Sequence, residues 1–80
     1  NFKYLSDYRN LLQYKSDNID FNTIEVINNE ILLTVQVKSI NDMALLIKKL
    51  EFDERYSIRN VSQQNSFKDL LYFSILLRSK

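Results

Sequence analysis

The residues of this chain whose types could support catalysis are carboxylates, hydroxyls and amines. Asp53 and Glu54 are adjacent and precede Arg55, while Asp17 follows a predicted helix end. Two carboxylates held at a fixed separation can act as general acid and general base. Each of these acids falls in a polar connection between predicted elements. We therefore interpret them as solvated turn charges and not as a catalytic pair.

Ser39 is the serine whose position most invites a nucleophilic role. A serine hydroxyl needs a neighbouring base to become a nucleophile. The chain contains no His, Cys, Gly, Pro or Trp, which excludes imidazole and thiolate chemistry, zinc clusters, glycine-rich phosphate loops and disulfides. Ser39 precedes Asp42 by three residues, which is the spacing of a helix N-cap. The sequence therefore predicts a protein that is not an enzyme, with no catalytic, cofactor-binding or metal-binding residues.

The charge balance argues against nucleic acid as a partner. Eleven basic and ten acidic residues give a net charge of +1, well below the concentrated positive charge that phosphate backbones require. RNA-binding sheets stack bases on several exposed aromatic rings. The predicted sheet offers one basic-aromatic pair, Arg59 opposite Tyr72, with Glu25 and Glu30 nearby. We predict no nucleic-acid binding.

The spacing of apolar residues predicts the elements of the first half of the chain. Residues 3–16 carry apolar side chains three and four apart, which is typical of a helix with one buried stripe. Residues 21–27 and 30–38 alternate between apolar and polar, as strands do. Asn tolerates positive φ, so Asn28 and Asn29 predict a two-residue hairpin turn between the strands.

This turn predicts the register of the first hairpin. A two-residue loop places Ile27 opposite Glu30 and determines every later pair. The pairs that follow are Val26 with Ile31, Ile24 with Leu33, and Asn22 with Val35. One face of the hairpin is then apolar and the other polar, so register and hydrophobic pattern agree.

The second half of the chain repeats the same pattern of elements. A helix over residues 40–51 follows Ser39, with Ile40, Met43, Ala44, Ile47 and Leu50 as its expected apolar stripe. Strands are predicted over residues 56–62 and 68–78, joined by a turn at Asn65 and Ser66. This turn would pair Tyr56 with Ile75, Ile58 with Phe73, and Asn60 with Leu71.

The order of these elements predicts the fold class. A chain of 80 residues is long enough for one core, so residues 1–80 are expected to form a single domain. Helix, strand, strand, twice repeated, predicts an α+β two-layer sandwich with a four-stranded antiparallel sheet of order 3-4-2-1 and both helices on one face. This arrangement (αββαββ) is a permuted ferredoxin-like fold. Because the chain starts at Asn1 and its one Met is Met43, we expect a domain excised from a longer protein.

The chain resembles a group of bacterial assembly proteins from Tyr4 to Leu77. The residues that carry the resemblance are IDFNTIEVINNEILLTVQVKSINDMALLIKKL and YSIRNVSQQNSFKDLLYFSILLRSK. They are similar to the periplasmic domains of the PilN/PilO-type pilus assembly proteins and of the L and M components of type II secretion. The resemblance implies the permuted ferredoxin-like fold, an upstream membrane anchor, and a location on the periplasmic side of the bacterial inner membrane.

The sheet face that the helices leave open is the expected interaction surface. Solvated sheet faces are normally polar, and a contiguous apolar patch marks an interaction site. Five residues are predicted to form such a patch: Leu32, Val61, Leu70, Tyr72 and Leu76. The first strand offers a second route, since Thr23 and Glu25 point outward from an edge with few protecting lysines or prolines.

We therefore expect a non-enzymatic interaction or scaffold domain of an inner-membrane platform for type IV pili or type II secretion. Its partner would be a second copy or a similar ferredoxin-like domain, bound without a cofactor. The alternative is a cytoplasmic regulatory domain that binds a small ligand or RNA on the same kind of sheet. A small enzyme subunit that relies on Tyr or Lys is a third, weaker hypothesis.

Overall fold

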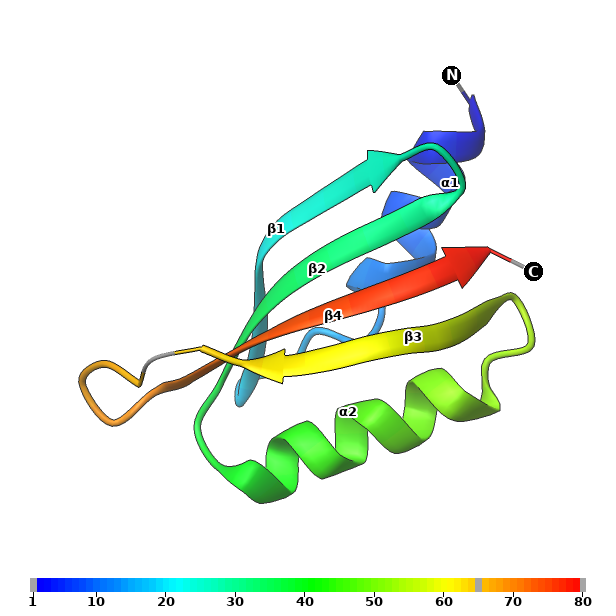
Figure 1. The fold of residues 1–80 in the computed structure, drawn as a ribbon. Coiled ribbons are helices and arrows are strands. Elements are labelled where there is room, and N and C mark those ends of the chain that lie inside the picture. Colours follow the sequence, from blue (N-terminus) through cyan, green and yellow to red (C-terminus); the bar gives the residue numbers. More distant parts are fainter. Residues whose placement is uncertain (1, 65, 80) are drawn as a thin grey trace.

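A computed structural model describes the backbone of residues 2–64 and 66–79, and the side chains within these ranges from Asp7 onward. The elements follow the expected order (Figure 1). They are α1 (Phe2–Leu12), β1 (Ile19–Ile27), β2 (Glu30–Val37), α2 (Ile40–Phe52), β3 (Tyr56–Gln63) and β4 (Leu71–Ser79). The side chains of Tyr4 and Leu5, expected on the apolar stripe of the first helix, lie outside the described residues.

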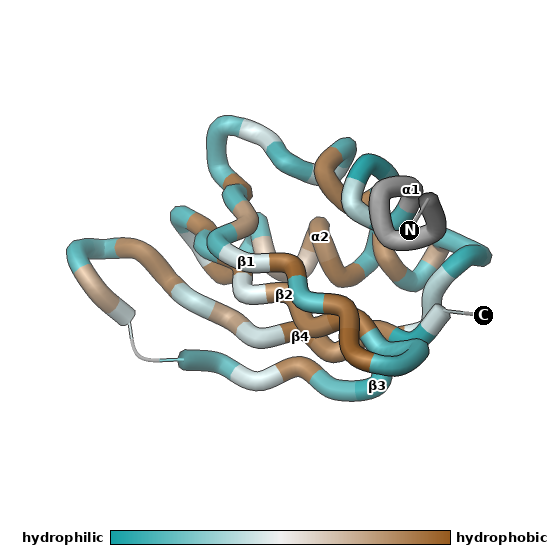
Figure 2. The backbone as a smooth tube through the Cα atoms, turned by 90° about the horizontal axis from the view of Figure 1, so that it is seen from above, coloured by the Kyte–Doolittle hydropathy of each residue, from teal (hydrophilic) through white to brown (hydrophobic). Residues whose placement is uncertain are grey.

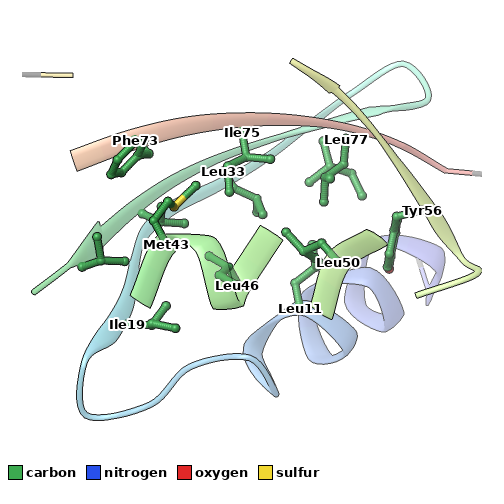
Figure 3. Packing of buried hydrophobic residues seen from close by; sticks show 13 residues of the cluster. Leu11, Ile19, Leu33, Met43, Leu46, Leu50, Tyr56, Phe73, Ile75 and Leu77 are labelled. Carbon is green, nitrogen blue, oxygen red and sulfur yellow. The ribbon is translucent and has the colours of Figure 1, made fainter. Parts of the chain in front are cut away.

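The four strands form one antiparallel sheet of order β1-β2-β4-β3, which is the expected order 3-4-2-1 counted from the opposite edge. Both helices lie on the same side of this sheet, with the apolar core between the layers (Figure 3). β4 begins with hydrophobic residues that alternate with more polar ones and continues as a short apolar run (Figure 2). The α+β class and the antiparallel sheet with two helices are confirmed.

The first hairpin has the predicted turn and most of the predicted register. Asn28 has a φ of 57°, and the pairs from Ile27 with Glu30 to Ile24 with Leu33 form as expected. The pair of Asn22 with Val35 is wrong, because a β-bulge between Phe21 and Thr23 places Phe21 opposite Val35. The extra residue keeps Phe21 and the buried Ile19 on the helix-covered face, where apolar side chains are stabilised.

The second hairpin turns later than predicted. The chain reverses at Lys68 and Asp69, whose φ values are 51° and 64°, and not at Asn65 and Ser66; Asn65 itself lies outside the described residues. Tyr56 therefore pairs with Ser79, four residues beyond the predicted Ile75. A shift of four residues leaves the same side chains facing the helices. Alternation of apolar residues could not distinguish the two registers.

A bulge in β3 changes which residues of that strand face the helices. Between Ile58 and Asn60 the register slips by one residue, so that Asn60 pairs with Leu76 and Val61 with Ile75. The predicted pairs of Ile58 with Phe73 and Asn60 with Leu71 are wrong. Opposed residues share a sheet face, and Ile75 is buried beneath the helices. Val61 is therefore on the helix-covered face.

Helix α2 begins as predicted but is rotated relative to the expected stripe. The Ser39 hydroxyl accepts a hydrogen bond from the Asp42 backbone N–H at 3.3 Å and donates one to the Asp42 carboxylate at 2.9 Å, which confirms the N-cap. The buried residues of α2 are Met43, Leu46 and Leu50 (Figure 3). Ile40 and Ala44, which the sequence placed on the inward stripe, are exposed instead.

Helix α1 is shorter than the predicted range of residues 3–16. It ends at Leu12, and tighter hydrogen bonds from the backbone N–H groups of Tyr14 and Lys15 to Leu11 and Leu12 close its last turn. Leu11 is fully buried in the core (Figure 3), whereas Tyr8 is half exposed.

The turn at Lys68 and Asp69 supplies a test of the observed register. Left-handed backbone costs about 1 to 2 kcal/mol at a residue that carries a Cβ, so replacing Lys68 with Asn and Asp69 with Gly should raise the free energy of unfolding by about 1 kcal/mol. Urea denaturation measures this value. Ser62→Gly, in the interior of β3, is the control and should destabilise by about 0.5 to 1 kcal/mol. A loss of stability in the turn variant would contradict the register.

Candidate protein-interaction surface

The open face of the sheet brings together only part of the predicted interface. Leu32 of β2 is opposite Leu76 of β4, and both are half-buried. Polar residues flank this pair, with Glu25 on β1 and Asn60 on β3 completing the row. The next row across the four strands consists of hydroxyl side chains: Thr23, Thr34, Ser74 and Ser62. The two leucines, with the exposed Ile27 diagonal to Leu32, thus form a small apolar patch in a largely polar face.

The remaining predicted interface residues are distributed over several places. Tyr72 is on the open face beside Gln36, while Leu70 precedes β4 and forms a β-bridge with Phe67. Thr23 and Glu25 are exposed on the edge strand β1, as expected. Val61 was predicted on the open face but lies on the opposite one because of the bulge in β3. The predicted pair of Arg59 with Tyr72 does not form, because the later turn at Lys68 and Asp69 places Tyr72 next to Gln64, just after β3.

The larger exposed apolar surface lies on the outer side of α2. Ile40 is 58% exposed, Leu45 50% and Phe52 81%, values that are high for large apolar side chains. We define the α2 surface as Ile40, Ala44, Leu45, Ile47 and Phe52. Four of these residues, all except Phe52, line a shallow groove whose polar rim includes Lys48 and Glu51.

A second hollow continues this groove toward the edge strand β3. It is lined by Ile58 and Val61 of β3, and it shares Ile47 and Glu51 with the first. Val61, 39% exposed, therefore belongs to an apolar surface, although not to the one predicted. Helix and edge strand together present one connected region to solvent.

Sequence reasoning assigned α2 a single inward stripe and missed this surface. The signal was present in its composition, since the sequence INDMALLIKKLEF is apolar on more than one stripe. A helix with one buried face is normally polar on the other. Of the apolar residues left over after Met43, Leu46 and Leu50 turn inward, Ile47 packs partly against the core, whereas Ile40, Leu45 and Phe52 are largely exposed.

The acids predicted to be solvated include one that is buried. Asp53 is only 9% exposed and terminates α2, where its backbone N–H donates to the Leu50 carbonyl. Its carboxylate accepts hydrogen bonds from the Tyr14 hydroxyl at 2.6 Å and from the Arg55 side chain at 2.9 and 2.8 Å. The Arg55 backbone N–H donates a further bond at 3.0 Å. These bonds, chiefly those from the Arg55 guanidinium, hold the pKa of Asp53 well below its usual range.

A second buried carboxylate faces a second tyrosine close by. The Tyr56 hydroxyl donates to Asp7 Oδ1 at 2.7 Å and accepts a longer bond from Asn10 Nδ2 at 3.5 Å. Burial, followed by the hydrogen bond to Asp7, raises the pKa of Tyr56 to about 12. The Arg55 guanidinium carbon lies 5.8 Å from the centroid of the Tyr56 ring.

We call these six residues the α1 clamp, because they join α1 and the segment after it to residues 53–56. The clamp consists of Asp7, Asn10, Tyr14, Asp53, Arg55 and Tyr56. Sequence reasoning missed it because the hydrogen-bonded pairs that join its two halves lie 39 to 49 positions apart along the chain. The spacing of seven between Asp7 and Tyr14, two helical turns, was the available signal.

The clamp has the composition of an active site but not its geometry. Each carboxylate is directed at a phenol, and Asp53 also at a guanidinium, so their hydrogen bonds are made within the protein. A phenol whose pKa is about 12 remains neutral at pH 7 and is a weak nucleophile. Within residues 2–64 and 66–79, no group of three metal-ligating side chains occurs either. We interpret the clamp as structural.

Fold and surface together define a class of protein: a small two-layer α+β domain with exposed apolar surface on α2 and β3. Across the described residues, no helix combines the length and the apolar character needed to cross a bilayer. No protein-family model matches the chain, and no curated protein matches it.

Among solved structures, the chain is similar to the periplasmic domain of EpsL from Vibrio parahaemolyticus. The two are 15% identical, and the superposition has a TM-score of 0.68 and covers 99% of this chain and 93% of that domain. At this identity the likeness establishes the fold alone. It agrees with the secretion L-type part of the resemblance seen in the sequence, and the link to PilN/PilO-type proteins receives no support from it.

The depressed pKa of Asp53 predicts an acid-sensitive contribution to stability. A carboxylate whose pKa is lower in the folded state stabilises the protein above its unfolded pKa of about 4, and this contribution is lost as the pH falls further. Asp53→Asn should therefore cost about 2 kcal/mol at pH 7 and less as the pH drops from 4 toward 2. Chemical denaturation across this range measures both values. Asp17→Asn, at an exposed position, is the control, and an equal effect of both variants at pH 7 would contradict the assignment.

Proposed function

We propose that this chain is a non-enzymatic protein-protein interaction domain that pairs with a second copy or with a similar ferredoxin-like domain. The observation that carries the proposal is the exposed apolar region formed by the α2 surface and the adjoining side of β3. Apolar patches of this kind on small domains mark binding sites for other proteins. The groove has no cluster of reactive side chains within it, so binding is its best-supported use.

The chemistry of the region favours a protein partner over a small polar ligand. Ile40, Leu45 and Ile47 make most of the groove lining apolar, and Phe52 adds an exposed ring at the end of α2. Lys48 and Glu51 are the charged residues of the lining. A mostly apolar surface with a few charged side chains suits an interface with another protein. Burial of about 800 Å² on each partner would be enough for a specific complex.

The setting that we propose is an assembly platform of type II secretion, on the periplasmic side of the bacterial inner membrane. The likeness to the periplasmic EpsL domain supports this setting, as does the resemblance seen in the sequence. In this proposal the fold is the permuted ferredoxin-like one and a membrane anchor precedes the domain in a longer protein. The domain would then act as a scaffold, through shape and apolar complementarity.

The proposal predicts which substitutions weaken association. Leu45→Glu and Phe52→Glu introduce charges into the α2 surface and should weaken self-association or binding to a similar domain at least about tenfold. Leu32→Glu and Leu76→Glu, on the open sheet face, are the matched controls and should have little effect. Sedimentation equilibrium between micromolar and millimolar concentrations measures self-association.

The contrary results are equally specific. Loss of association in the Leu32 and Leu76 variants alone would move the interface to the open sheet face. A strict monomer that also fails to bind other platform domains would contradict the proposal. If such a monomer gained thermal stability with a small ligand or RNA, the regulatory alternative would replace it.

A further inference from the structure

The α1 clamp has a second property, which goes beyond the proposed function: it attaches a terminal helix by polar contacts. Two short hydrogen bonds make this attachment, and each side of the clamp supplies one donor. A tyrosine within residues 53–56 donates to an acid of α1. A tyrosine just after α1 donates to an acid within residues 53–56. These bonds are Tyr56 to Asp7 at 2.7 Å and Tyr14 to Asp53 at 2.6 Å. They hold α1 itself at Asp7 and the connection that follows it at Tyr14.

Much of the apolar core does not depend on α1. Of residues 7–12, the part of α1 whose side chains are described, only Leu11 belongs to the buried cluster. The rest of that cluster comes from the sheet and from α2, which contributes three residues. Figure 3 shows α2 lying beneath Leu33, Ile75 and Leu77, with α1 set farther from the sheet. The sheet and α2 thus keep a two-layer core when α1 is displaced.

The connectivity also permits α1 to move alone. It is the first element of the fold, so a single connection at residues 13–18 joins it to β1. Its departure would break the phenol-carboxylate bonds and expose Leu11, but it would leave every strand pair intact. Elements that open independently of the global unfolding reaction make few buried apolar contacts, as the described part of α1 does.

We infer that α1 is a releasable helix, held against a separately folded sheet and α2 by the α1 clamp. In the released state the domain keeps its four strands and α2, and the surface beneath Leu11, next to Leu50 and Tyr56, becomes accessible. Any segment joined to the start of α1 could then change its direction relative to the sheet without unfolding of the domain. The hydrogen bonds of the clamp determine the fraction of molecules in which α1 is released.

Native-state hydrogen exchange of the whole chain tests this inference. In the wild-type protein, the amides of residues 6–12 should exchange measurably slower than unfolded peptide but at least about tenfold faster than those of β2 and β4. Tyr14→Phe removes one clamp bond and should speed exchange in α1 by about tenfold. Tyr8→Phe makes the same change on the exposed side of α1 and should leave the exchange rate unaltered.

A core substitution separates release from global unfolding. Ile75→Val weakens the sheet core, which persists after release, so it should speed exchange in β2 and β4 several-fold and leave α1 unchanged. Equal rates in α1, β2 and β4 of the wild-type protein would overturn the inference. So would an equal acceleration of α1 by Ile75→Val, an absence of any effect of Tyr14→Phe, or an α1 without protection.

Discussion

The pairing of β2 with β4 at the centre of the sheet is the constraint on which the rest of this fold depends. Ile31, Leu33 and Val35 are opposite Leu77, Ile75 and Phe73, and all six side chains are buried. Each contributes about 1.5 to 3 kcal/mol when it leaves water. One face of the sheet must therefore be covered, while the other, with its row of hydroxyl groups, can remain in solvent. Both helices and both edge strands are placed by this requirement.

The spacing of apolar residues, alternate in the strands and three to four apart in the helices, was sufficient to predict these elements, their order and the face of each central strand residue. It could not predict register wherever a shift preserves that alternation, which is why the turn at Lys68 and Asp69 was missed. The β-bulges at Asn22 and Arg59 are also invisible to it, because a bulge changes the facing residue without changing composition. Val61 was misplaced for this reason alone.

Helix α2 and the α1 clamp show a different limit of sequence reasoning. The rotation of α2 was decided by which of two apolar stripes packs better against the sheet, and only tertiary contacts make that choice. Asp53 was taken for a solvated acid because its partner Tyr14 is 39 positions away. Local sequence reports what a residue can do, whereas long-range packing decides which partner it meets.

The missed features are the ones on which the proposed function rests. The stripe of α2 that the core does not use is exposed, and it adjoins an edge strand whose bulge turns Val61 toward it. The proposed protein-binding function rests on this exposed part of α2 and on the adjoining side of β3.

The most direct test of this account is to record amide chemical shifts by NMR while the protein is diluted from millimolar to micromolar concentration. The account predicts that the shifts that change with concentration cluster at residues 40–52 and on β3, and that those of Leu32 and Leu76 stay constant. Changes confined to the open sheet face, or spectra that do not change with dilution or with addition of a similar domain, would contradict it.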